Sequence, residues 1–174
     1  MNRILSKTLA IGFAVAAGLA VASMYAVAGG EDNSAALAKA LSEASVSLDQ
    51  GLSASESTGK PISGKFEMQD GALQLSVYTM KGDQFAEVIV DHKSGSIKKS
   101  EPITEGDDLK AAKEQGEAMG KAKRSLGEAV ANAIKANNGF RATSVEPTLD
   151  GGRPAASVTL VNGQATKKVT ESLD

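Results

Sequence analysis

Cysteine is absent from the 174-residue chain, and histidine occurs only once, at position 92. The lack of cysteine excludes disulfide bonds and thiol chemistry. A metal site normally needs three or more converging ligands, and no second histidine exists to join His92. No G-x-S-x-G pattern or other arrangement of nucleophile and base is visible, so we do not expect an enzyme.

Aromatic residues are also scarce, because after position 28 the chain contains only Phe66, Tyr78, Phe85 and Phe140. The core must therefore depend on Val, Leu, Ile and Ala, which favours small units of modest stability. The formal net charge is −2, and no basic segment is interleaved with aromatic residues. Nucleic acid and anionic membrane surfaces are thus disfavoured as partners.

The segment 1–28 has the pattern of an export signal. Arg3 and Lys7 precede a run rich in Ala, Val and Leu, and Ala26-Val27-Ala28 fits a signal-peptidase site. We expect cleavage near Ala28 and a periplasmic or secreted protein, with no membrane segment beyond the signal. An uncleaved N-terminal anchor is the alternative, because the run is nearly long enough to span a bilayer.

Two regions of alternating polar and apolar residues predict antiparallel strands. Each has two strands joined by a turn, at residues 72–80 and 84–90 in the first region and at 155–161 and 164–170 in the second. The regions align at a constant offset of 81 in residue number, with one insertion to match Asp70-Gly71 with Asp150-Gly151. A helical stretch precedes each region, at 34–48 and 125–139, whereas the polar residues 51–61 indicate a loop inserted in the first.

The sequence therefore predicts an α+β fold with two repeats of a helix packed on a small antiparallel β-meander. The segments are the signal at 1–28, a first unit at 29–103, a charged helical linker at 104–122 and a shortened second unit at 123–174. The linker is either part of one long helix or separated from the next helix by a joint near residues 123–125. A missing last strand in the second unit would leave an edge to which a partner strand could add.

The stretch VDHKSGSI, residues 90–97, resembles the turn V-D-x-x-T-G-x-[IV] that ends PepSY domains, with serine in place of threonine. Residues 125–149 look like the helix and first strand of the same family. The resemblance implies a binding module and not an enzyme. Such domains occur in propeptides of secreted metallopeptidases and as free-standing periplasmic proteins, some of which bind metal ions, including lanthanides.

The pair Asp91-His92 could be a chemical site, but the surrounding residues favour a structural turn. An aspartate at this position caps the backbone two residues on, and Gly95 supplies a positive φ. We therefore expect the strand to end at Val90 and to resume at Ile97.

Several carboxylates gather around the predicted linker. Ca²⁺ and lanthanide ions want six or more oxygen ligands, which such a cluster could supply. Lys110 and Lys113 lie among these acids, so the alternative is a solvated helix start whose first aspartates favour the helix dipole. The candidate ligands are Glu101, Glu105, Asp107, Asp108, Glu114 and Glu117.

Tyr78 and Met80 are expected on the sheet face opposite the helix. We expect this face either to be covered by the other repeat or to dock on a partner protein. The leading expectation is a non-enzymatic binding protein that docks on or modulates a periplasmic partner such as a peptidase, through Tyr78 and Met80. The alternative is a hard-cation binding protein that uses the acidic linker.

Overall fold

The computed structural model describes the backbone of residues 30–174 and the side chains from residue 36 onward. The predicted export signal therefore lies outside the described residues. The helices are α1 (Gly30–Leu41), α2 (Leu48–Ser55), α3 (Gly106–Lys121) and α4 (Leu126–Ala136). The strands are β1 (Lys60–Gln69), β2 (Ala72–Lys81), β3 (Gln84–Val90), β4 (Ile97–Ile103), β5 (Arg141–Asp150), β6 (Arg153–Asn162) and β7 (Ala165–Ser172).

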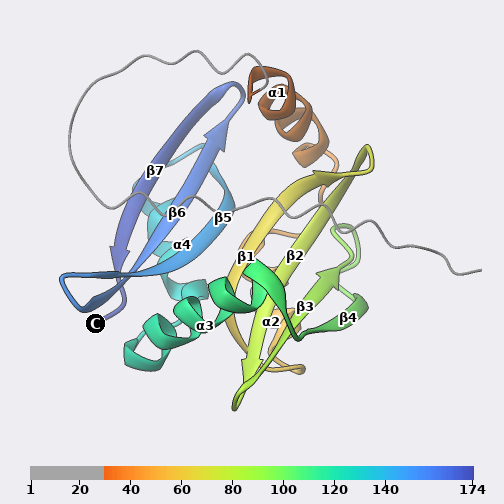
Figure 1. Cartoon of the computed structure of the whole chain (residues 1–174). Coiled ribbons are helices and arrows are strands. Elements are labelled where there is room, and N and C mark those ends of the chain that lie inside the picture. The colour runs from red at the N-terminus through yellow and green to blue at the C-terminus, as the bar shows by residue number, and fades with distance from the viewer. Residues whose placement is uncertain (1–29) are drawn as a thin grey trace, which may run out of the picture.

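All seven strands form one antiparallel sheet in the order β4-β3-β2-β1-β5-β6-β7 (Figure 1). The predicted α+β class is correct. The predicted small size of the sheet is wrong, because β1 and β5 pair and join both meanders into one larger sheet. This junction is short, with Gly64 opposite Val145 and Lys65 opposite Ser144.

The strand pairings on the two sides of this junction use the same register. Gly64 lies opposite Val77 in the first hairpin, and their counterparts at an offset of 81, Val145 and Val158, lie opposite each other in the second. The two-residue turns at 70–71 and 151–152 have the same offset, and all four of their residues have positive φ. The predicted insertion between these turns is therefore wrong.

The helical stretches differ from the prediction in the first half of the chain. Residues 34–48 are not one helix, because α1 ends at Leu41, where the Ser42 hydroxyl donates to the Lys39 carbonyl at 2.6 Å. A second helix, α2, begins after Ser47, whose backbone N–H donates to the Gln50 side chain at 2.9 Å. The predicted loop at 51–61 is thus wrong, since half of it is helical. Serine-rich sequence breaks and restarts helices because its hydroxyls compete for backbone groups.

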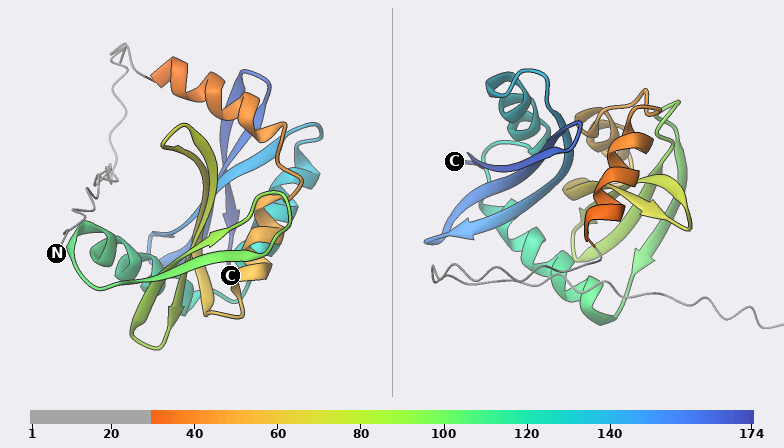
Figure 2. Two further views of the ribbon diagram at one scale, coloured as in Figure 1. Left: turned by 90° about the vertical axis from the view of Figure 1, so that its right-hand side faces the viewer. Right: turned by 90° about the horizontal axis from the view of Figure 1, so that it is seen from above.

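Helices α2 and α4 lie side by side on one face of the sheet, here called the α2 face (Figure 2, left). Gly64 lets the side chains of Leu48 and Leu52 approach the sheet closely. The main core fills this layer with aliphatic residues, among them Leu48, Leu52, Leu75, Val77, Val130, Val158 and Leu160.

Helix α3 lies on the opposite face of the sheet, here called the α3 face (Figure 2). Residues 104–122 therefore include a helix that packs on the sheet, with Ala112 and Met119 almost fully buried. The alternative with two helices is the one observed, because α3 ends at Lys121 and the Ser125 hydroxyl caps α4 by accepting from the Glu128 N–H. Among residues 30–174, no helix is long and apolar enough to cross a membrane.

Candidate binding site

A hydrogen-bonded network of polar side chains crosses β1 and β2 on the α3 face. The ammonium of Lys65 lies 2.8 Å from one carboxylate oxygen of Glu67. The Ser76 hydroxyl donates to the other oxygen at 3.0 Å and accepts from the Gln74 amide at 2.9 Å. Because these side chains are largely shielded from water, the network presents a fixed pattern of polar groups.

Tyr78 continues the network toward β3. Its hydroxyl donates to the Glu87 carboxylate at 3.4 Å, and the Lys65 ammonium lies 5.9 Å from the centre of its ring. Burial, together with the negative charges of Glu87, Glu67 and Asp108, raises the pKa of the Tyr78 hydroxyl far above its usual value. The phenol therefore stays protonated at physiological pH, where it is a hydrogen-bond donor and not a base.

Met80, the other residue predicted to bind a partner, packs against α3. A Cβ atom at Gly116 would lie 3.2 Å from the Met80 sulfur and 3.1 Å from the ring of Phe85. The absence of a side chain at Gly116 lets the helix approach the strands this closely. A hydrogen bond of 2.8 Å from the Ser63 hydroxyl to Gln115 holds the same part of α3 on the sheet. Met80 is thus mainly a packing residue.

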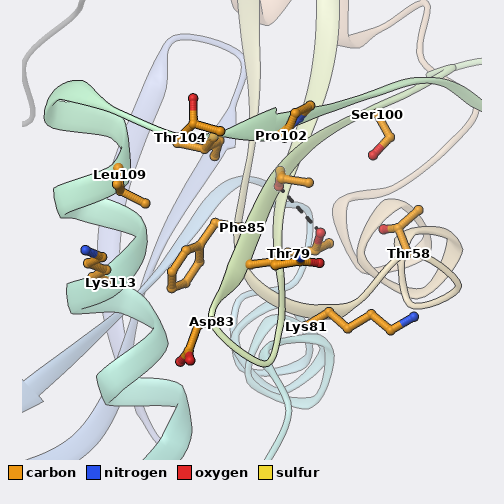
Figure 3. Close-up of a pocket in the computed structure, with 13 residues that line it drawn as sticks. Thr58, Thr79, Lys81, Asp83, Phe85, Ser100, Pro102, Thr104, Leu109 and Lys113 are labelled. Carbon is orange, nitrogen blue, oxygen red and sulfur yellow. Dashed lines mark hydrogen bonds between the residues drawn. The ribbon is translucent and has the colours of Figure 1, made fainter.

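A cavity of about 530 Å³ opens next to this contact, between the β2–β3 hairpin, β4 and the first half of α3 (Figure 3). The ring of Phe85 points from β3 toward α3, where Leu109 and Lys113 lie (Figure 3). Pro102 and Ile103 close the side formed by β4. The volume is within the range of about 300–1,000 Å³ that is typical of ligand pockets.

The cavity combines an apolar wall with charged groups at its rim. Phe85, Ile103 and Leu109 supply the wall, while the exposed residues Lys81 and Asp83 of the hairpin supply charges of both signs. Such a cavity can enclose an apolar side chain and pair with charges that flank it. One feature of the sequence pointed to this cavity, because Phe85 follows the turn after Tyr78 and Met80. Nothing in the sequence indicated that α3 would lie beside it.

The acidic residues predicted to hold a cation are spread over β4, α3 and the connection between them. Glu101 pairs with Lys99 at 2.8 Å, and Glu117 pairs with Lys121 at 3.0 Å. Within the described part of the chain, no three acidic or histidine side chains are grouped closely enough to hold a metal ion. The structure therefore does not bring together Glu101, Glu105, Asp107, Asp108, Glu114 and Glu117, and the cation site stays a prediction from sequence.

Asp91 shapes the turn between β3 and β4. One carboxylate oxygen accepts from the N–H groups of Lys93 at 2.8 Å and Ser94 at 2.7 Å, and the other lies 2.8 Å from the Lys98 ammonium. These interactions, with Lys98 the strongest, hold the pKa of Asp91 well below its usual value. Gly95 has a φ of 77°, and the next strand begins at Ile97.

His92 contributes to this turn through its backbone. Its carbonyl oxygen accepts from the N–H groups of Ser45 and Val46, each at 3.0 Å, and so ties the α1–α2 connection to the turn. Within the described residues, its buried Nδ1 atom has no hydrogen-bond partner. The geometry assigns Asp91 and His92 a structural role at this corner of the sheet.

The site that emerges has two parts, the polar network centred on Tyr78 and the cavity lined by Phe85. Comparison of the chain with protein-family models, with curated proteins and with solved structures found no match.

Proposed function

We propose that the chain is a non-enzymatic exported binding protein of the PepSY type, which docks on a periplasmic protein partner such as a peptidase. The observation that carries this proposal is the cavity lined by Phe85 and Leu109, between the β2–β3 hairpin and α3. The partner inserts an apolar side chain between Phe85 and Leu109, and its flanking residues meet the charges at the rim.

The character of the cavity favours a protein segment as its occupant. Its wall is apolar, and its mouth carries Lys81, Asp83 and Lys113, which suits a peptide with an apolar anchor between polar neighbours. Interfaces of this kind depend on a few buried anchor residues surrounded by polar contacts that exclude water. Phe85 and Leu109 are the anchor contacts in this account.

Two side chains of the polar network favour binding over proton transfer. Tyr78 is held in its protonated form, and Lys65 is paired with Glu67. A general base needs a pKa near the working pH, and burial moves Tyr78 in the opposite direction. This arrangement supports a recognition surface.

The proposal includes a duplicated architecture in which each half of the chain is one PepSY-like unit. The identical strand registers of the two hairpins, with Val77 and Val158 as counterparts, support it. This proposal moves the predicted linker into the second unit, with α3 as its first helix, as α1 is of the first unit, and with α2 corresponding to α4. The cavity then lies where the second unit's first helix meets the first unit's strands.

Charge reversal at the rim tests the proposal. Residues 29–174 are immobilised as wild type, as Lys81→Glu/Lys113→Glu and as Lys135→Glu, a control at an exposed position of α4. Exported proteins of the source cell are passed over each column and quantified. We expect at least one protein that wild type and control retain and that the double variant loses. Retention of the same proteins by all three forms would contradict the proposal.

A further inference from the structure

The outer edge of β7 is an open strand edge. Within the described residues, β7 pairs only with β6, so every second backbone N–H and C=O along Ala165–Ser172 points away from the sheet. Most of the strand is exposed. An exposed edge of this length is a template for pairing with another strand.

The other edge of the sheet, β4, is protected against such pairing. Pro102 has no N–H to donate, and a register shift near Val90 interrupts the strand pairing. The charges of β4 are engaged within the chain, since Lys98 pairs with Asp91 and Lys99 with Glu101. β7 contains no proline, and its pairing with β6 has no register shift.

The charges on β7 are arranged so that the strand is complementary to itself. Lys167, Val169 and Glu171 share the α2 face, because side chains alternate along a strand. When a second β7 runs antiparallel to the first, centred on Val169, each Lys167 lies directly opposite Glu171 of the second copy. Neither Lys167 nor Glu171 takes part in an ion pair among the described residues, although the Lys167 ammonium lies 4.8 Å from the centre of the Phe140 ring.

We propose that two copies of the chain associate through β7, forming a symmetric dimer with one sheet continuous across both copies. Backbone hydrogen bonds and the two Lys167–Glu171 pairs stabilise the contact, with the two Val169 side chains at its centre. Lys168 lies opposite Thr170 of the second copy, so the two Lys168 ammonium groups are not placed against each other. The cavity beside Phe85 lies near β4, at the far edge of each sheet, and stays accessible.

A charge-exchange experiment tests this interface. Lys167→Glu and Glu171→Lys each place like charges opposite one another in a homodimer, which weakens self-association about tenfold or more. An equimolar mixture of the two variants restores both opposite-charge pairs in a heterodimer. In sedimentation velocity we expect wild type to be dimeric, each variant alone to dissociate, and the mixture to be dimeric. A monomeric wild type, or variants that dimerise as tightly as wild type, would overturn the proposal.

A cysteine crosslink provides a second readout that does not depend on charge. The chain has no cysteine, so Val169→Cys introduces a single thiol at the centre of the proposed contact. Opposite residues in antiparallel strands have Cα atoms about 4.5–5.5 Å apart, within reach of a disulfide. Mild oxidation is expected to link Val169→Cys into covalent dimers but not the control Thr148→Cys, at the exposed end of β5. Equal crosslinking of the two variants would count against the interface, and thermal unfolding confirms that both fold.

Discussion

Gly64 and Val145 lie directly opposite each other in β1 and β5, at the short junction that joins the two hairpins into one sheet. Their residue numbers differ by 81, the offset that also relates the two hairpins, so each faces its own counterpart. The strand pairing therefore follows the same register on both sides of the β1–β5 junction. Lys60 and Arg141 are also 81 residues apart, and each contacts a helix end. The Lys60 ammonium donates to the Met119 carbonyl at 2.6 Å, and Arg141 donates to the Leu41 carbonyl at 2.6 Å.

These two basic residues hold the helices of the opposite half of the chain. Arg141 on β5 contacts the C-terminal turn of α1, with a second hydrogen bond of 3.2 Å to Ala44, and Lys60 on β1 contacts the C-terminal turn of α3. A cation at a helix C-terminus interacts favourably with the last carbonyls and the helix dipole. The two contacts thus link the two halves beyond the short β1–β5 junction.

Removing either contact is expected to loosen one helix and not the other. Arg141→Met deletes a charged hydrogen-bonding group and should lower the free energy of unfolding by about 1–3 kcal/mol, with a smaller loss for Lys60→Met, which is more exposed. Hydrogen exchange should accelerate at residues 36–46 in the first variant and at 115–122 in the second. Faster exchange of the same helix in both variants would contradict the cross-linked arrangement.

Two glycines provide a matched test of the helix packing. A Cβ atom at Gly51 in α2 would lie 2.5 Å from a methyl carbon of Leu75, whereas a Cβ at Gly120 in α3 would meet nothing within 4 Å. Gly51→Ala should lower the free energy of unfolding by about 1–3 kcal/mol through overpacking. Gly120→Ala should raise it by up to about 1 kcal/mol through helix propensity. Denaturant unfolding measures both, and a stabilised Gly51→Ala would show that α2 does not pack on the sheet as described.

The turn at Asp91 predicts part of the acid sensitivity of the fold. The pKa of Asp91 is lower in the folded chain than its unfolded value of about 3.9. Its contribution to stability is therefore fully present above about pH 4 and is lost as the pH falls below that value. Asp91→Asn removes the titrating group, so its melting temperature should fall less than that of wild type between pH 6 and pH 2.5. Parallel melting curves for the two proteins would remove Asp91 as a source of acid sensitivity.

The Tyr78 hydroxyl is expected to contribute little to stability. Its hydrogen bond to Glu87 is long, at 3.4 Å, so Tyr78→Phe should change the free energy of unfolding by no more than about 1 kcal/mol. If Tyr78 belongs to the binding surface, the same substitution should weaken retention of the partner protein. Tyr78→Phe is preferable to Tyr78→Ala, which would also empty a half-buried space. If Tyr78→Phe retains the partner protein as well as wild type does, the binding site is limited to the cavity.

Local sequence patterns were sufficient to predict most of the strands but not their assembly. Alternation predicted the hairpin of strands at 72–80 and 84–90, and the helical stretch predicted at 125–139 contains α4. Pairing of β1 with β5 depends on contacts between residues far apart in the sequence, which no local pattern encodes. Gly64 at this junction has no side chain to signal its burial.

The candidate site was predicted only in part for a similar reason. The polar residues around Tyr78 lie on one face by simple alternation, so its place on that face followed from the sequence. The sequence of α3 is strongly charged and suggested a linker with an acidic cluster. Gly116 and Met119 instead pack this helix on the sheet, and that packing creates the cavity beside Phe85. The packing of α3 on the sheet could not be inferred from the composition of its sequence.

Photo-crosslinking in living cells tests the proposed docking site most directly. A photoreactive amino acid replaces Thr104 at the rim of the cavity or, as a control, Lys135 on α4; both positions are exposed. After irradiation, the account predicts an adduct with one exported protein from position 104, which disappears when Lys81→Glu/Lys113→Glu is introduced in the same chain. No adduct from position 104 above the level seen at position 135 would contradict docking at the cavity.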